Sequence, residues 1–235
     1  MHEAEFDKFA DEYRTLHTSN IRMSGESPEF FAEYKVRDVI ETLSAAGLPG
    51  LAQPAILDFG GGIGSSVPHF RKHCPQARLT CLDVSRRSLE IASARFPGLA
   101  DFRWFDGRTI PFADESFDVA FAACVFHHID HALHVHLLRE IRRVLAPGGT
   151  IFIFEHNPLN PLTRHAVNTC AFDEGAHLIS GWTMRRRLVE AGFADARTRY
   201  RLFFPAALSS LRPLEKFLTW MPLGAQYCVV GRKHP

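Results

Sequence analysis

The sequence lacks the features that would assign it to a disulfide-bonded, membrane-spanning or nucleic-acid-binding class. Its five cysteines are scattered and none forms a Cys-x-x-Cys pair, so neither a disulfide framework nor a thiolate zinc site is indicated. No stretch approaches the roughly 20 apolar residues that span a bilayer, and the acidic N-terminal residues lack the apolar run of a signal peptide. A formal net charge of +1 gives no attraction for nucleic acid or anionic lipid. We therefore expect a cytoplasmic protein with no nucleic-acid partner and no stable membrane insertion.

The middle of the chain alternates short apolar runs with helical patterns. We expect strands over residues 55–59, 78–83, 100–105, 117–123 and 150–155, helices between them, and two later strands over 196–204 and 226–232. Two helices are expected before the first strand, over 3–16 and from Pro28 toward Gly47. Short runs buried on both faces are typical of a parallel sheet, and right-handed crossovers place helices on both of its faces. The pattern predicts an α/β fold with a doubly wound, Rossmann-like sheet.

Ligands of such a sheet bind beyond the carboxyl ends of its strands, and four features of this sequence fall there. They are the loop Asp58-Phe59-Gly60-Gly61-Gly62-Ile63-Gly64, then Asp83, Asp106-Gly107 and Val125-Phe126-His127-His128-Ile129. Glycines permit positive φ and let backbone amides approach a ligand at the start of a helix. A carboxylate about 20 residues later is placed to accept ribose hydroxyls. Plainer interpretations stay open: the loop as a tight turn, and Asp83 as a helix cap, a role that Ser85 would also fill.

The glycine loop and Asp83 also fit a nicotinamide dehydrogenase, but the glycine spacing argues against one. The dinucleotide fingerprint is Gly-x-Gly-x-x-Gly, and counted from Gly60 its third glycine falls on Ser65. Here the glycines alternate as Gly60, Gly62 and Gly64 after the acidic Asp58.

That arrangement, with Asp83, Asp106 and the segment 143–149, resembles the class I S-adenosylmethionine-dependent methyltransferases. The resemblance is closest to the small-molecule "type 11" branch, which includes ubiquinone and menaquinone methyltransferases. It spans about residues 56–155 and includes Pro111-Phe112 and Ser116-Phe117-Asp118. It implies seven strands, mostly parallel, with the last antiparallel beside the fifth and the two late strands as a hairpin. It also implies S-adenosylmethionine as cofactor and S-adenosylhomocysteine as product.

The resemblance carries cofactor-binding roles onto eleven positions. They are Tyr13, Asp58, Gly60, Gly61, Gly62, Gly64, Asp83, Val84, Asp106, Gly107 and Cys124. The glycines would surround the methionine part, Asp83 would bind the ribose, and Val84 would pack against the adenine. Asp106 and Gly107 would flank the adenine, Cys124 would lie near the methionine part, and Asp58 would orient the loop through its amides. Tyr13 resembles the aromatic that closes over the cofactor, although a core aromatic is an equal alternative.

The acceptor of the methyl group is less defined by the sequence. His127 or His128 would serve as a general base for a hydroxyl acceptor, so we expect O-methylation; a histidine that only serves the fold is the alternative. The segment 155–158 is a second candidate cluster, with simple turn chemistry as its alternative. Zinc held by His127, His128, His131 and His134 lacks a carboxylate set, so we expect no metal. A protein that binds the cofactor without catalysis, as a regulatory or assembly subunit, also stays open.

We expect one methyltransferase domain over residues 1–235. A helical cap would occupy 1–50, the cofactor-binding core 54–156, and a lid insertion with the β-hairpin 157–235. The lid segments hold many aromatics, which would suit an apolar or amphipathic small-molecule acceptor. These are Phe30, Phe31, Tyr34, Phe172, Trp182, Phe203, Phe204, Phe217 and Trp220. The sequence leaves the oligomeric state open.

Overall fold

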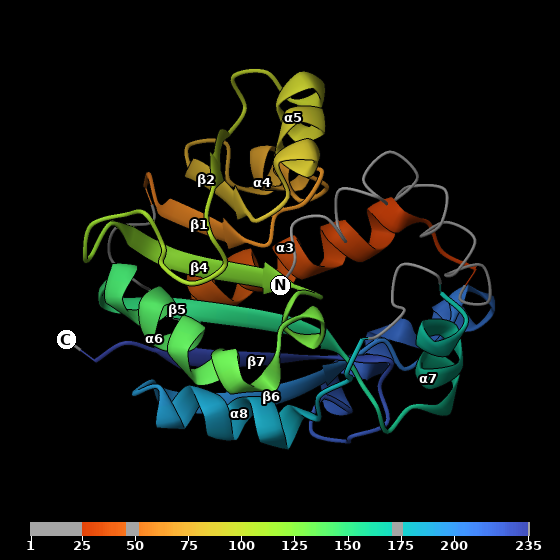
Figure 1. Cartoon of the computed structure of the whole chain (residues 1–235). Coiled ribbons are helices and arrows are strands. Elements are labelled where there is room, and N and C mark those ends of the chain that lie inside the picture. The colour runs from red at the N-terminus through yellow and green to blue at the C-terminus, as the bar shows by residue number, and fades with distance from the viewer. Residues whose placement is uncertain (1–24, 46–51, 171–175, 235) are drawn as a thin grey trace.

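Seven strands form one sheet in the computed structural model, which describes residues 25–45, 52–170 and 176–234. The strands are β1 (Ala55–Phe59), β2 (Arg78–Asp83), β3 (Asp101–Trp104), β4 (Phe117–Ala123), β5 (Leu145–His156), β6 (Ala194–Arg201) and β7 (Gln226–Arg232). Their order is β3-β2-β1-β4-β5-β7-β6 (Figure 1). β1 to β5 pair in parallel, whereas β7 is antiparallel to both of its neighbours. The predicted Rossmann-like sheet with an antiparallel strand beside the fifth is confirmed.

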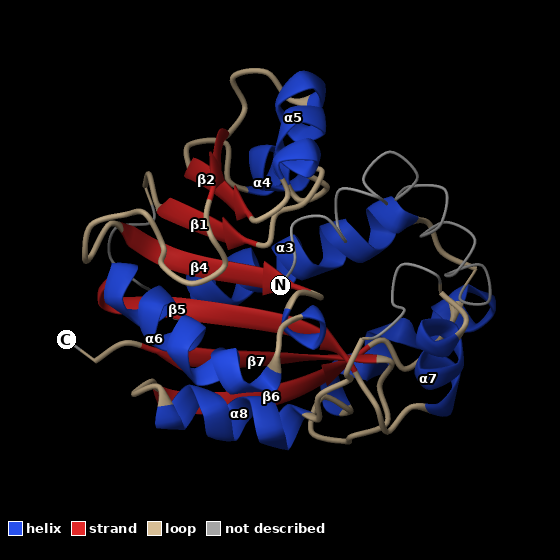
Figure 2. Cartoon of the chain, in the orientation of Figure 1, coloured by secondary structure: helices blue, strands red, loops and turns tan. Residues whose placement is uncertain are grey.

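Helices cover both faces of this sheet (Figure 2). The helices of the described residues are α3 (Pro28–Ala45), α4 (Val67–His73), α5 (Arg86–Arg95), α6 (His134–Val144), α7 (Pro161–Asn168) and α8 (Gly181–Glu190), with 3-10 helices η2 (Phe126–His128), η3 (His131–Leu133) and η5 (Ala206–Phe217). On one face, Val36 and Val39 of α3 and Phe70 of α4 pack against the strands. On the other face Leu137 of α6 and Leu188 of α8 do so. The sheet is therefore buried on both sides, which is why its strands read as continuous apolar runs.

Four strands have the bounds that the sequence predicts, namely β1, β2, β4 and β7. β5 begins earlier than expected, at Leu145 instead of Thr150, because Leu145 pairs with Phe117 and because Gly148 and Gly149 exchange backbone hydrogen bonds with Lys233. Residues 147–149, whose Pro-Gly-Gly sequence is typical of a turn that ends a helix, are thus part of a long strand. β6 ends at Arg201 and not at residue 204, since Leu202 has a positive φ of 63°.

The expected helix over 3–16, with Tyr13, and Phe172 lie outside the described residues. Within the described ranges, no helix is long and apolar enough to cross a membrane.

Candidate active site

The carboxyl ends of β1, β2 and β4 border one cavity of about 390 Å³. Eight of the predicted site residues line it: Asp58, Gly60, Gly61, Gly62, Asp83, Cys124, His127 and His128. The remaining lining comes mainly from α3, α7 and residues 202–205. The structure therefore brings the glycine loop and both histidines to the same space.

The glycine loop is folded onto β2 by its own amides. The N–H groups of Gly60 and Gly61 donate to the carbonyl of Leu82, at 2.8 and 3.2 Å. The N–H of Gly62 donates to Oδ2 of Asp83 at 2.8 Å. Gly62 has a φ of +50°, and a Cβ placed there would meet nothing within 4 Å. The expectation that the loop amides approach a ligand is therefore wrong for Gly60 and Gly61, whose amides bind β2, while Gly62 borders open space.

The sequence left two roles open for Asp83, helix capping and binding of ligand hydroxyls, and the structure assigns the capping role to Ser85. The Ser85 hydroxyl accepts from the N–H of Ser88 and caps α5. The Asp83 carboxylate holds the amides of Gly62 and Ser85 and lines the cavity. Capping thus belongs to Ser85, and Asp83 is a carboxylate at the cavity wall, where it fits a ligand that carries hydroxyl groups.

Asp58 is buried beneath the loop and contacts it by a different route from the one expected. Its Oδ2 accepts the hydroxyl of Ser66, and the Cys81 thiol lies 3.9 Å away. Burial raises the pKa of Asp58 to about 7, although the Ser66 hydrogen bond opposes the rise. Asp58 therefore positions the loop through the Ser66 side chain, and not through loop amides.

Four predicted cofactor residues lie outside the cavity lining. Gly64 has a positive φ and packs against α5, where an added Cβ would come within 3.0 Å of the Phe96 ring. Val84 belongs to the core of the sheet. Asp106 is exposed and Gly107 is buried in the turn that they begin, in which Oδ1 of Asp106 accepts two backbone amides at 2.8 Å. The roles of Val84, Asp106 and Gly107 toward the adenine, and of Gly64 toward the methionine part of the cofactor, stay predictions.

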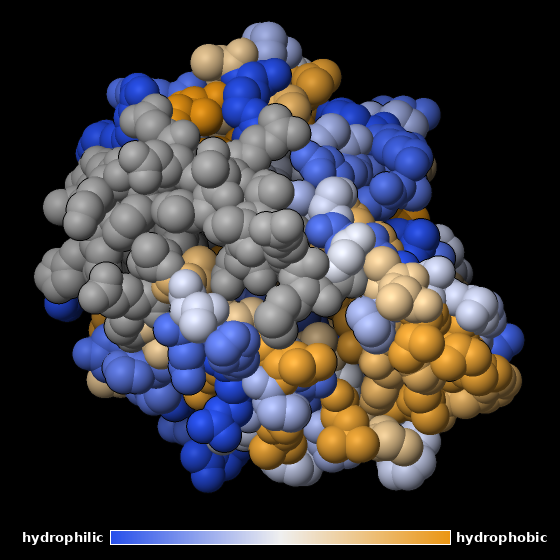
Figure 3. Space-filling model, turned by 90° about the vertical axis from the view of Figure 1, so that its right-hand side faces the viewer, coloured by the Kyte–Doolittle hydropathy of each residue, from blue (hydrophilic) through white to orange (hydrophobic). Residues whose placement is uncertain are grey.

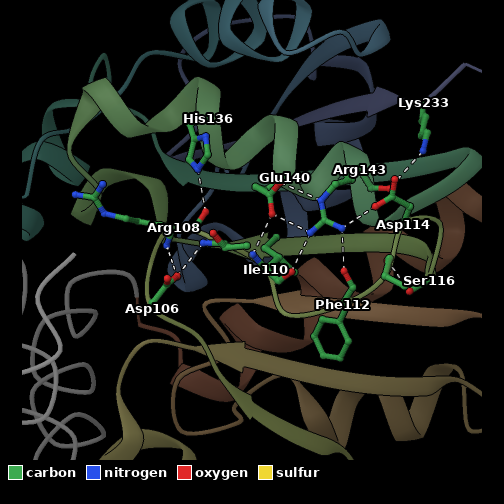
Figure 4. A network of polar contacts seen from close by, with 12 residues as sticks. Asp106, Arg108, Ile110, Phe112, Asp114, Ser116, His136, Glu140, Arg143 and Lys233 are labelled. Atoms are coloured by element: carbon green, nitrogen blue, oxygen red, sulfur yellow. Dashed lines mark hydrogen bonds and ion pairs between the residues drawn. The ribbon is translucent and has the colours of Figure 1, made fainter.

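Arg143 of α6 fixes the loop that follows this turn (Figure 4). Its guanidinium donates to the carbonyls of Ile110 and Phe112 and to the carboxylates of Asp114 and Glu140, all at 2.8 to 2.9 Å. The two carboxylates raise the pKa of Arg143. The motif around Arg143 thus serves to hold the loop before β4, away from the cavity.

His127 is held by a buried carboxylate. Its Nδ1 lies 2.5 Å from Oε2 of Glu155, and both residues are 1% exposed. The other oxygen of Glu155 accepts the N–H groups of Val125 and Phe126. Burial opposes ionisation of Glu155, but His127, His156 and the amide of Phe126 outweigh it and keep its pKa below the usual value. An ionised carboxylate accepts here, so Nδ1 of His127 carries the proton and Nε2 is left as the basic nitrogen.

Removal of the Glu155 carboxylate should be costly. In a Glu155→Ala variant two buried amides and the His127 ring lose their acceptor, so we expect the free energy of unfolding to fall by about 3 kcal/mol. Chemical denaturation measures the difference. The Glu155→Gln variant keeps one amide-accepting oxygen and should lose less than half of that amount. Equal stability of Glu155→Ala and wild type would show that η2 is held by other contacts.

The remaining histidines and asparagines have mostly structural partners. His134 is buried in α6, with Nε2 near the carbonyl of Ile129 and Nδ1 near the Arg187 guanidinium. Asn157 and Asn160 form turns and tie α7 to the carbonyls before β7. The turn interpretation of these two asparagines is confirmed. Over residues 25–45, 52–170 and 176–234, no group of three or more His, Cys, Asp and Glu side chains is arranged to hold a metal ion.

Lys35 is a site residue that sequence analysis missed. Its ammonium lies 3.5 Å from Sγ of Cys124, which follows β4 and has a positive φ of 58°. Burial would raise the pKa of Cys124, but Lys35 and His156 outweigh it and lower this pKa from 9.0 to about 7. The sequence feature that could have revealed Lys35 is its place between Tyr34 and Val36, two residues that are buried in the core.

The lowered pKa makes Cys124 the thiol expected to react first. Its alkylation by iodoacetamide should quicken as pH rises and be half-maximal near pH 7, because the thiolate is the nucleophile. Peptide mass spectrometry over a pH series measures it, with buried Cys81 and Cys228, whose pKa burial raises, as internal controls. A Lys35→Met variant should move the midpoint upward. A midpoint unchanged by that substitution would contradict the role of Lys35.

The aromatic roof expected over the cavity is only partly present. Phe30, Phe31, Phe203 and Phe204 line it, as do four residues of α7. Tyr34 is buried and donates its hydroxyl to Gln226. The expectation is wrong for Trp182, Phe217 and Trp220, which are 58%, 65% and 72% exposed and lie outside the lining.

The segment from β1 to β5 is also recognisable by comparison with known proteins. The model of the family described as "Methyltransferase domain" matches residues 57–153. This segment, less than half of the chain, is thus similar to a methyltransferase domain. The cofactor of such a domain is S-adenosylmethionine.

Curated relatives of this methyltransferase domain act on different acceptor atoms. One is the ubiquinone/menaquinone biosynthesis C-methyltransferase UbiE of Desulfotalea psychrophila, 34% identical over 117 residues, which cover 49% of this chain and 46% of that protein. Another is the malonyl-[acyl-carrier protein] O-methyltransferase of Dechloromonas aromatica, 30% identical over 133 residues, which cover 57% and 47%. The chain thus spans about half the length of the curated relatives it matches.

The fold likeness extends over nearly the whole chain. A crystal structure of an S-adenosylmethionine-dependent methyltransferase from Thermotoga maritima is 20% identical, with a TM-score of 0.68 over 98% of this chain and 99% of that one. The methyltransferase domain and the segments around it therefore share one fold with that protein.

Proposed function

We propose that the chain transfers a methyl group from S-adenosylmethionine to an oxygen atom of a small, apolar or amphipathic acceptor. One observation carries this proposal. A single cavity is bordered by the glycine loop and Asp83 on one side and by His127, α7 and residues 202–205 on the other. Such a cavity holds a cofactor and an acceptor next to each other, which is the main requirement of methyl transfer.

The residues at the loop fit the cofactor. Gly62 leaves open space where any other residue would place a side chain, and the Asp83 carboxylate beside it suits the two ribose hydroxyls. When bound, S-adenosylmethionine supplies a methyl group on a positively charged sulfur. The chain contributes alignment of the acceptor and exclusion of water by Phe31, Phe203 and Leu162, which line the same cavity.

Oxygen as the acceptor atom is supported by the pair of His127 and Glu155. A neutral imidazole whose Nδ1 is fixed by a carboxylate leaves Nε2 to accept a proton from a hydroxyl. His127 lines the cavity, and so do His128 and His156, whose rings lie 4.1 and 5.3 Å from that of His127. His127 is thus the candidate general base, with His128 next to it.

An apolar acceptor is supported by the surface around α7. Figure 3 shows apolar residues gathered on the side of the molecule where α7 lies. The exposed apolar side chains of α7, η5 and the following turn are Leu162, Leu208, Leu211, Leu214, Phe217, Trp220 and Leu223. Leu162 belongs both to this surface and to the cavity, so an apolar part of an acceptor would meet apolar groups on entry.

Two measurements test the proposal. Calorimetry should show binding of S-adenosylmethionine and S-adenosylhomocysteine but not of NAD. Transfer of a labelled methyl group should then be found with apolar acceptors that carry a hydroxyl, and not with matched amines or carbon acids. Cofactor binding without transfer to any acceptor would favour a binding subunit, and absence of cofactor binding would overturn the proposal.

A further inference from the structure

Lys35 lies near the middle of α3 and is only 7% exposed. It lines the cavity at the carboxyl edge of the sheet, next to Cys124 and 5.8 Å from the centre of the Tyr34 ring. A lysine is almost never buried to this extent unless a group of opposite charge accompanies it. The Cys124 thiol, with a pKa of about 7, balances this charge only in part, so a full negative charge must come from a carboxylate at the cavity or from a ligand.

Four carboxylates near the cavity are engaged by other groups. Glu26 pairs with Arg212, Asp58 accepts from Ser66, Asp83 holds amides, and Glu155 holds His127. Lys35 forms no ion pair with any carboxylate of residues 25–45, 52–170 and 176–234, and its ammonium donates to the Cys124 sulfur at 3.5 Å. By contrast Arg212, another cation of the lining, is neutralised by Glu26.

We propose that Lys35 forms an anion subsite in the cavity and takes a carboxylate group of a bound ligand. The inference rests on the proposed function, in which two molecules share the cavity. Two sources supply the same chemistry there: the carboxylate on the methionine part of the cofactor, and an acidic head group of the acceptor.

The surroundings of Lys35 suit such a group. The Gln226 amide nitrogen lies 4.0 Å from the Cys124 sulfur and 3.4 Å from Nδ1 of His156, so two further polar side chains lie near the sulfur that contacts the ammonium. Phe31 and Leu202 make the same part of the lining apolar. A buried ammonium in apolar surroundings attracts an anion more strongly than one in water. A charge-assisted hydrogen bond of this kind corresponds to about 10- to 100-fold in affinity.

Calorimetry with two pairs of probes tests the subsite and separates its sources. The cofactor arm compares S-adenosylhomocysteine with 5′-methylthioadenosine, which lacks the amino-acid part. The acceptor arm compares decanoate with decanol, which share one apolar chain, on protein saturated with S-adenosylhomocysteine. Each probe is titrated into wild type, Lys35→Met, the charge-retaining Lys35→Arg, and Lys72→Met, a control on the exposed side of α4. Thermal unfolding checks the fold, and Lys35→Gln replaces the methionine variant if that one fails to fold.

Lys35→Met is expected to weaken one carboxylate probe about 10- to 100-fold, leave its uncharged counterpart unchanged, and be rescued by Lys35→Arg. A loss with S-adenosylhomocysteine assigns the subsite to the cofactor, and a loss with decanoate assigns it to the acceptor. No change in either arm, or equal weakening of charged and uncharged probes, overturns the subsite. A wild type that binds no S-adenosylhomocysteine contradicts the proposed function instead, and decanoate on the ligand-free protein then tests Lys35 alone.

Discussion

Gly60→Ala is expected to bind S-adenosylhomocysteine at least about 100-fold more weakly than the wild type. Gly60 has a φ of +74°, and a Cβ there would lie 2.5 Å from a methyl carbon of Val125. Val125 has little room to yield, because its side chain is β-branched and its amide is held by Glu155. The loop must therefore move off β2, which displaces Gly62 from the Asp83 carboxylate.

Gly98→Ala is the matched control for this prediction. Gly98 has nearly the same φ, +72°, but a Cβ there would meet nothing within 4 Å, and it lies outside the cavity lining. Both variants therefore carry the cost of positive φ in a residue with a side chain, roughly 1 kcal/mol, and only Gly60→Ala adds the clash. Calorimetry with S-adenosylhomocysteine compares the two. Similar affinities for both variants would show that the position of the Gly60 loop does not govern cofactor binding.

His127→Asn is expected to lower kcat by about 100- to 10,000-fold while leaving the affinity for S-adenosylhomocysteine within about twofold. The asparagine amide reaches toward Glu155 as Nδ1 of the imidazole does, so the buried carboxylate keeps a donor. The substitution removes only the nitrogen that would take the proton of a hydroxyl acceptor. Turnover is measured with the first hydroxyl acceptor found by labelled methyl transfer.

His128→Asn serves as the comparison for His127. Both histidines line the cavity, and the Glu155 carboxylate of β5 orients His127. We expect a loss of less than about 10-fold for His128→Asn, because the carboxylate-oriented His127 is the candidate base and stays in place in this variant. Near-normal turnover of His127→Asn would end the assignment of His127 as base and leave it a residue that holds η2 to β5.

Local patterns in the sequence were sufficient for much of the fold. The run 55–59 is apolar at four of its five positions because β1 is covered on both faces, and its bounds could therefore be predicted. The capping role of Ser85 could be predicted because a helix cap depends only on residues next to it in the sequence. The early start of β5 could not be predicted, because Leu145 belongs to the strand only through its pairing with Phe117, a residue distant in sequence.

The same distinction between local patterns and contacts distant in sequence applies to the site. Gly60 and Asp83 follow strands directly, so their place at the carboxyl edge follows from topology alone. The contact of Lys35 with Cys124 joins residues 89 apart, and the turn at Asp106 lies outside the cavity lining. No local pattern distinguishes a helical lysine that points into a cavity from one on a solvated face. The prediction for Trp182 was wrong for the same reason, since the sequence pattern around a helical aromatic residue is the same whether it covers a cavity or lies on the surface.

β7 has a consequence for how the molecule is made. It follows β6 along the chain, yet it lies between β5 and β6 and supplies Gln226 to the floor of the cavity. During synthesis, β5 and β6 emerge from the ribosome before the strand that joins them, and each waits with an unpaired edge. The half of the sheet that carries the glycine loop can pair as it emerges, whereas the half beneath α7 and α8 must wait for β7. A nascent chain stalled before Gln226 would thus hold a cofactor loop beside two strands open to pairing with other chains.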